Sequence, residues 1–225
     1  MKSNISAFIL VILSAFSLFS CTSQKMIQED FHTETYKSRT TYFSEHPLLP
    51  GQIIFFGNSI TQAGEWSSYF PTAHVTNRGI SGDNTEGMLA RLPEIEKAQP
   101  SKFFIMAGIN DISLSRPNRM IVKNYRQIIR SLRNASPHTQ ICMQSVLPIN
   151  NDFGRYKRLR GKERQIVELN TQLRLLAQSE GVTFINLYPF FINSEGKLKK
   201  EFTGDGLHLS AEAYALWVQI IQPYF

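Results

Sequence analysis

The sequence is poor in cysteine and lacks the patterns of several common protein classes. It has two cysteines in 225 residues, too few for a disulfide framework, and neither has a cysteine or histidine partner at metal-ligand spacing. No Gly-x-Gly-x-x-Gly or Walker-type loop follows the first predicted strand, which argues against a nucleotide-binding protein. Basic and aromatic residues do not interleave, and a net charge of +6 is too mild to indicate nucleic-acid binding. We therefore expect no metal, no organic cofactor and no nucleic acid.

Long apolar runs are also scarce, and the clearest one lies at the N-terminus. It covers residues 7–19 after Lys2 and is too short for a dependable membrane span, so it predicts a signal peptide. Leu18-Phe19-Ser20-Cys21 resembles a bacterial lipoprotein cleavage box, in which Cys21 carries the lipid. Plain secretion is the alternative. No acidic run follows Cys21, so we expect a lipid anchor in the bacterial cell envelope that faces the periplasm.

The remaining chain has the composition and length of one globular α/β domain. We expect signal and lipobox in residues 1–21, a tether and an aromatic-rich segment in 22–50, and the domain in 51–225. Tyr36 and Phe43 could lie on one short helix packed beside the first strand. Cys142 lies in an apolar run and is expected to be a buried free thiol. The oligomeric state is not predicted.

Short apolar runs alternate with amphipathic segments through the domain. Amphipathic periodicity predicts helices after Asp83 or Asn84, after Pro117, before Gly181 and after Ser210. No internal repeat is present. The alternation predicts a parallel sheet with helices on both faces. The predicted strands cover residues 53–56, 73–76, 102–107, 140–147 and 182–187.

The most informative stretch is residues 52–62, where a buried strand is followed by Gly57 and then by Ser59. Open α/β sheets bind their ligands at the carboxyl ends of the strands, which is where this serine lies. The free N–H groups of a helix that begins there would stabilise negative charge. Taken alone, however, the stretch is better explained by a serine that caps a helix, because Gly-Asn-Ser is common turn chemistry.

Three later stretches change this interpretation: residues 77–83, 108–111 and 205–210. Ser59, Gly79, Asn110 and His208 occur in the order and context found in the SGNH hydrolases, the GDSL-type esterases. From about residue 52 onwards the chain resembles that family. The resemblance implies a three-layer α/β/α sandwich of flavodoxin-like type, with about five parallel strands. Asn58 stands where the family name has an aspartate.

The resemblance also implies roles for particular residues. Ser59 needs a base, and among five histidines only His208 follows a carboxylate, Asp205, in a glycine-bounded loop. Ser59 is then the nucleophile, His208 the general base, and Asp205 the group that orients the imidazole. The backbone N–H groups of Ser59 and Gly79 and the amide of Asn110 are the expected donors to the oxyanion.

Other enzyme classes fit less well. An α/β-hydrolase is expected to carry Gly-x-Ser-x-Gly, but Thr61 occupies the place of the second glycine. Such a hydrolase also has a long segment between acid and histidine, whereas Asp205 lies three positions before His208. A non-catalytic lipoprotein that binds glycans is the alternative from another class.

The substrate is predicted less sharply than the chemistry. We expect a short-chain ester, most often an acetyl group on carbohydrate, because no second long apolar segment is present to form an acyl tunnel. A lysophospholipase, a lipid deacylase like platelet-activating-factor acetylhydrolase, and a thioesterase are the alternatives. Residues 150–162 form a basic loop, in which Arg155, Arg158 and Arg160 are either simply solvated or attract an anionic substrate.

Overall fold

The computed structural model describes residues 31–225, so the predicted signal peptide and Cys21 lie outside the described residues. A five-stranded parallel sheet with the strand order β2-β1-β3-β4-β5 forms the centre of the fold. The predicted α/β class with a parallel sheet is thereby confirmed. The strands are β1 (Ile53–Gly57), β2 (Val75–Gly79), β3 (Lys102–Met106), β4 (Gln140–Gln144) and β5 (Thr183–Ile185).

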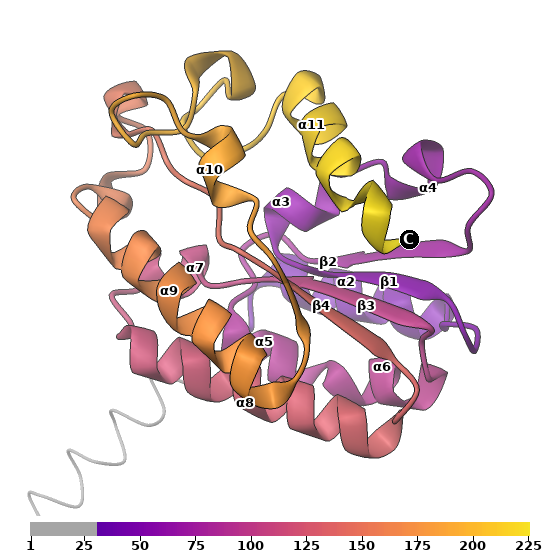
Figure 1. The fold of residues 1–225 in the computed structure, drawn as a ribbon. Coiled ribbons are helices and arrows are strands. Elements are labelled where there is room, and N and C mark those ends of the chain that lie inside the picture. The colour runs from indigo at the N-terminus through magenta and orange to yellow at the C-terminus, as the bar shows by residue number, and fades with distance from the viewer. Residues whose placement is uncertain (1–30) are drawn as a thin grey trace, which may run out of the picture.

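Helices cover both faces of the sheet and complete a three-layer sandwich (Figure 1). The helices α5, α6, α8 and α9 lie on one side, and α11 lies on the other. The α-helices are α2 (Glu34–Glu45), α3 (Ser59–Gln62), α4 (Trp66–Tyr69), α5 (Thr85–Ala90), α6 (Leu92–Ala98), α7 (Ile109–Ser113), α8 (Asn118–Ala135), α9 (Glu163–Glu180), α10 (Tyr188–Phe191) and α11 (Ala211–Ile221). Short 3₁₀ turns are η1 (Asn151–Phe153), η2 (Lys157–Leu159), η3 (Lys200–Phe202) and η4 (Gln222–Tyr224).

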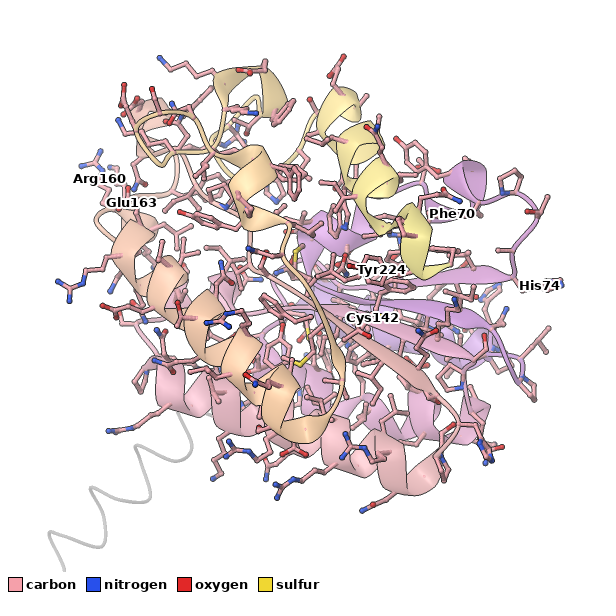
Figure 2. The ribbon with its side chains drawn as sticks, viewed as in Figure 1. Phe70, His74, Cys142, Arg160, Glu163 and Tyr224 are labelled. Carbon is pink, nitrogen blue, oxygen red and sulfur yellow. The ribbon has the colours of Figure 1, made fainter. Side chains whose placement is uncertain are left out.

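The central strand β1 is apolar on both faces because both faces are covered by helices. On one face Phe55 stacks on Trp66, with ring centroids 3.9 Å apart, and on Phe104 of β3 at 4.9 Å. On the other face Phe56 lies 5.3 Å from Phe103. Figure 2 shows the predicted buried thiol, Cys142, in the interior of the molecule, where it is a free cysteine.

Several predicted boundaries differ from the structure. The fourth strand ends at Gln144 in place of residue 147, and the fifth covers Thr183–Ile185 in place of residues 182–187. The second strand begins two residues later than predicted and extends to Gly79, because its register pairs Val75 with Ile53 and Gly79 with Gly57. The helix predicted after residue 84 is divided into α5 and α6. Pro93 has no N–H with which to continue the hydrogen-bond ladder, and the chain therefore turns at Arg91 before α6 begins.

The aromatic segment packs on the loop that follows β2. The predicted short helix is present as α2, which is capped by Thr33, and its Tyr36 and Phe43 form a small core with Ile80. The Tyr36 hydroxyl donates to the carbonyl of Gly87 at 2.9 Å. This segment therefore supports the position of a loop that also borders the candidate site.

The sheet topology determines where the candidate residues meet. Strand β2 is added on one side of β1, whereas β3, β4 and β5 are added on the other, so the order of the strands switches between β1 and β3. Ligands in open α/β sheets bind beside such a switch point, outside the carboxyl ends of the strands. Ser59 follows β1 and Asn110 follows β3. Between residues 31 and 225, no helix has the length and apolar character that a membrane span requires.

Candidate active site

A tight connection between β1 and α3 exposes Ser59. A Cβ atom on Gly57 would lie 2.1 Å from Thr61 Oγ1 and 2.8 Å from the carbonyl oxygen of Met106, so only glycine fits. Asn58 is buried and caps α3, since its Oδ1 accepts the N–H of Ile60 at 3.0 Å. Ser59 is the first residue of the helix, and its N–H donates to no other group of the described chain.

His208 and Asp205 lie beside this serine in one line of hydrogen bonds. His208 Nε2 is 3.0 Å from Ser59 Oγ, and His208 Nδ1 is 2.8 Å from Asp205 Oδ2. The other carboxylate oxygen, Oδ1, accepts the backbone N–H groups of Leu207 at 2.9 Å and His208 at 2.8 Å. The carboxylate is thus fixed by its own loop.

The charge of Asp205 selects the useful form of the imidazole. Burial acts to raise the pKa of Asp205, but hydrogen bonds from His208, Tyr156 and the backbone hold that pKa well below its usual range. The ionised carboxylate accepts a hydrogen bond from the N–H at Nδ1, which leaves Nε2 without a proton and free to accept that of Ser59 Oγ. This arrangement has the chemistry of an activated nucleophile.

Tyr156 also contacts this pair, and sequence reasoning missed it. Its hydroxyl lies 2.7 Å from Asp205 Oδ2 and 3.0 Å from His208 Nδ1. The contact joins residues 49 and 52 positions apart, which no local pattern reveals. In the sequence it lies in the basic loop beside Arg155, where the local pattern indicates only a charged surface.

The prediction that the N–H of Gly79 donates to the oxyanion is not supported by the structure. Its N–H already donates to Asn77 Oδ1 at 2.9 Å. A Cβ atom at this position would lie 2.2 Å from the backbone nitrogen of Gln62. Glycine is therefore required at position 79 so that the end of β2 can pack closely against α3.

Gly82 is the better candidate from the same loop. It is exposed, has a φ of 80°, and has no atom within 4 Å of the position of an added Cβ. Its N–H donates to no other group among residues 31–225. Its neighbours are anchored: Ser81 N–H donates to Gln62 Oε1 at 2.6 Å, and the Asp83 carbonyl accepts Asn110 Nδ2 at 2.7 Å. The sequence shows both glycines, and only packing distinguishes them.

Asn110 lies at the start of α7, directly after β3 and Gly108. One N–H of its amide is used by the bond to the Asp83 carbonyl. A primary amide carries two N–H groups, so one donor is left. The side chain is half-buried, as a donor at the floor of an open site should be.

A buried guanidinium ties this edge of the sheet together. Arg91 donates to the carbonyls of Arg78 at 2.8 Å and Gly57 at 3.1 Å, and its Nε donates to Asp83 Oδ2 at 2.8 Å. Burial raises the pKa of Asp83 to about 6, although Arg91 opposes the shift. Arg91 thus holds together the end of β1, the end of β2 and the loop that contains Gly82.

The basic loop borders the site through Tyr156 and carries unneutralised charge. Arg155, Arg158 and Arg160 are exposed, and none forms an ion pair within the described residues. Figure 2 shows Arg160 at the outer edge of the molecule, near the start of α9. By contrast, Glu180 pairs with three arginines of α8, namely Arg126, Arg130 and Arg133.

Among residues 31–225, no group of three histidine, cysteine, aspartate or glutamate side chains could hold a metal ion.

Comparisons with known proteins agree with this architecture. The model of the GDSL-like Lipase/Acylhydrolase family matches residues 55–216. Platelet-activating factor acetylhydrolase IB subunit alpha1 of Rattus norvegicus is 28% identical over 170 residues, which cover 72% of this chain and 70% of the relative. The human protein of the same name is 27% identical over 170 residues, with the same coverage.

Solved structures resemble the chain over most of its length. A protein from Streptococcus pneumonia, described as a candidate platelet activating factor, has a TM-score of 0.76 and 27% identity, and the match covers 91% of this chain and 98% of that one. A GDSL-like lipase from Bacteroides thetaiotaomicron has a TM-score of 0.73 at 24% identity, with 84% and 96% coverage, and shows the shared fold. The chain therefore belongs to the GDSL-like lipase/acylhydrolase family of the SGNH hydrolase superfamily, and it is an ester-hydrolysing enzyme.

Proposed function

We propose that the chain cleaves short-chain carboxylic esters with Ser59, His208 and Asp205, and that acetyl groups on carbohydrate are its substrates. The observation that carries the proposal is the unbroken line of hydrogen bonds from Ser59 Oγ to His208 at 3.0 Å and from His208 to Asp205 at 2.8 Å. Such a line supplies a nucleophile, its base and the group that orients the base.

The reaction proceeds in two acyl transfers. His208 Nε2 takes the proton of Ser59 Oγ while Oγ attacks the ester carbonyl, and Asp205 stabilises the imidazolium that forms. The imidazolium then gives its proton to the departing alcohol oxygen, which leaves an acyl group on Ser59. Water, deprotonated by the same nitrogen, attacks this acyl group, and the acid leaves as Ser59 recovers its proton.

Three donors stabilise the oxyanion in this proposal. They are the N–H of Ser59, the free N–H of the Asn110 amide and the N–H of Gly82. Removal of one such donor typically lowers kcat by about 10²–10³. The helix N-terminus at Ser59 adds partial positive charge at the same point.

The acetyl preference has two supports. The curated relatives carry the name of an acetylhydrolase. The proposed envelope location would bring the enzyme close to glycans. Because those relatives are named for platelet-activating factor, a lipid deacylase is the second candidate.

The test combines one substitution with a set of esters. Ser59→Ala should abolish hydrolysis of p-nitrophenyl acetate, while Ser68→Ala, at an exposed serine of α4, should leave it unchanged. Rates should fall from acetate through butyrate to palmitate, and acetylated oligosaccharides should release acetate. A preference for palmitate would contradict the short-chain proposal. Faster cleavage of an acetylated ether phospholipid than of any acetylated glycan would favour the lipid substrate.

A further inference from the structure

Tyr156 reaches the Asp205–His208 pair from outside its loop, and the proposed mechanism gives it no task. Its side chain comes from the basic loop, between η1 and η2. The hydroxyl is 2.7 Å from Asp205 Oδ2, and the phenol ring meets the imidazole edge-on, with centroids 5.9 Å apart and planes at 68°. This geometry is more specific than ordinary packing.

The hydroxyl and the imidazole share one oxygen of the carboxylate. Asp205 Oδ1 is already occupied by the backbone N–H groups of Leu207 and His208. Oδ2 accepts from His208 Nδ1 at 2.8 Å and from the Tyr156 hydroxyl at 2.7 Å. The hydroxyl donates to Oδ2 although Nδ1 lies 3.0 Å away, because Nδ1 carries the proton that it donates to the same oxygen and so cannot accept.

We propose that Tyr156 is a positioning residue that draws off part of the negative charge of Asp205 Oδ2, and thereby keeps His208 available as a base at lower pH. A carboxylate that accepts one more hydrogen bond attracts the imidazolium less strongly, so the uncharged ring persists further into the acidic range. The inference rests on the proposed function, because it assumes that His208 acts as the base.

Few other polar or charged groups lie close to Asp205 and His208, and Tyr156 is the principal side chain from another loop that contacts them. From α3 the pair meets only the uncharged hydroxyl of Ser59, and Thr203 contributes a neutral Oγ1 at 3.4 Å from Asp205 Oδ1. Arg155 is the charged neighbour whose field reaches Tyr156, and it acts to lower the pKa of that phenol. Lys200 of η3 is close to another carboxylate, that of Asp152, and helps to lower its pKa.

The phenol keeps its proton throughout the working range. Burial, together with the hydrogen bond to Asp205, raises the pKa of Tyr156 to about 12. The hydroxyl therefore remains a donor at every pH at which the enzyme would be assayed, and the effect does not depend on its titration.

The experiment compares Tyr156→Phe with Tyr188→Phe. Both tyrosines are half-buried, but the Tyr188 hydroxyl lies 3.4 Å from the carbonyl of Gly196 and touches neither Asp205 nor His208. In a profile of kcat/KM against pH, Tyr156→Phe should move the acid limb upward by roughly half a pH unit to one unit. Rates well below the limb should fall about threefold to tenfold, while the neutral plateau is nearly retained. Tyr188→Phe should leave the limb in place.

A spectroscopic measurement separates this inference from the proposed function. A proton in a charge-assisted Nδ1–H···Oδ2 bond gives a far-downfield NMR resonance, which Asp205→Asn should remove. In Tyr156→Phe the resonance should move further downfield, and it should do so in the Ser59→Ala background as well. A protein that is inactive on all esters but whose resonance still moves would refute the proposed function, while the effect of Tyr156 on the bond between Asp205 and His208 would stand. An unmoved resonance and limb, or an equal loss of rate at every pH, would overturn the inference.

Discussion

Asn58 replaces the aspartate of the family name, and its side chain does the work of a helix cap. Its Oδ1 accepts the N–H of Ile60 and so orders the first turn of α3, in which Ser59 lies. A carboxylate oxygen would accept the same bond. The amide differs in charge, since it places no buried anion next to the serine where negative charge develops during the reaction.

Asn110→Ala tests the side-chain donor to the oxyanion. We expect kcat to fall by about 10²–10³ and KM to change little, because the second N–H of the amide acts mainly in the transition state. The measurement is steady-state hydrolysis of p-nitrophenyl acetate. Asn118→Ala is the matched control, since Asn118 is also half-buried and its amide also donates to a backbone carbonyl, that of Gln165. A loss confined to KM would exclude the proposed role.

Among single residues, the sequence predicts those that belong to a recognisable motif and misses those whose role depends on a contact between distant parts of the chain. Ser59, Asp205 and His208 could be predicted because the serine block and the Asp-x-x-His block each have a recognisable order and spacing. The motif does not distinguish Gly79, the last residue of β2, from Gly82 three positions later. Only the packing of Gly79 against Gln62 and its bond to Asn77 separate the two. Tyr156 could not be predicted, since its contacts cross 49 and 52 residues.

The boundaries of helices and strands could be predicted where interactions between residues close in sequence determine them. The helices α8 and α9 were predictable from periodicity, and α11 was predictable from its cap at Ser210. The end of β2 was not predictable, because it is set by pairing with β1 and not by the apolar pattern of residues 73–76. The division of α5 from α6 could have been read from Pro93, which lies one residue inside the second helix.

The basic loop is the element on which a substrate preference should depend. Replacement of Arg155, Arg158 and Arg160 by alanine removes three exposed and unpaired cations. KM should rise about threefold to tenfold for an anionic acetyl ester and stay nearly constant for a neutral one, because exposed charges act mainly by long-range attraction. Added salt should reduce the difference.

A charge-matched control lies at the far end of α8. The control variant replaces Arg126, Arg130 and Arg133 by alanine and loses the same charge. These arginines form ion pairs with Glu180 and do not border the site. Equal effects of both triple variants on anionic esters would mean that net charge, and not the loop, determines the preference.

For the molecule as a whole, we propose that the enzyme is held at a membrane by a lipid on Cys21, which lies outside the described residues. In a bacterium that expresses the full chain, the protein should sediment with membranes, and Cys21→Ser should move it to the soluble fraction. Cys142→Ala is the control and should stay with the membranes, because that thiol is buried in the sheet. A soluble parent protein would exclude the anchor.

The large sequence separation between Ser59 and His208 determines when the enzyme can become active. The two side chains are 149 positions apart, and the base arrives only when the last strand and the final loops have been placed. An incompletely folded chain therefore holds an inert alcohol at Ser59, with no imidazole placed to deprotonate it. Catalytic competence is thus a property of the completed fold and of no shorter part of it.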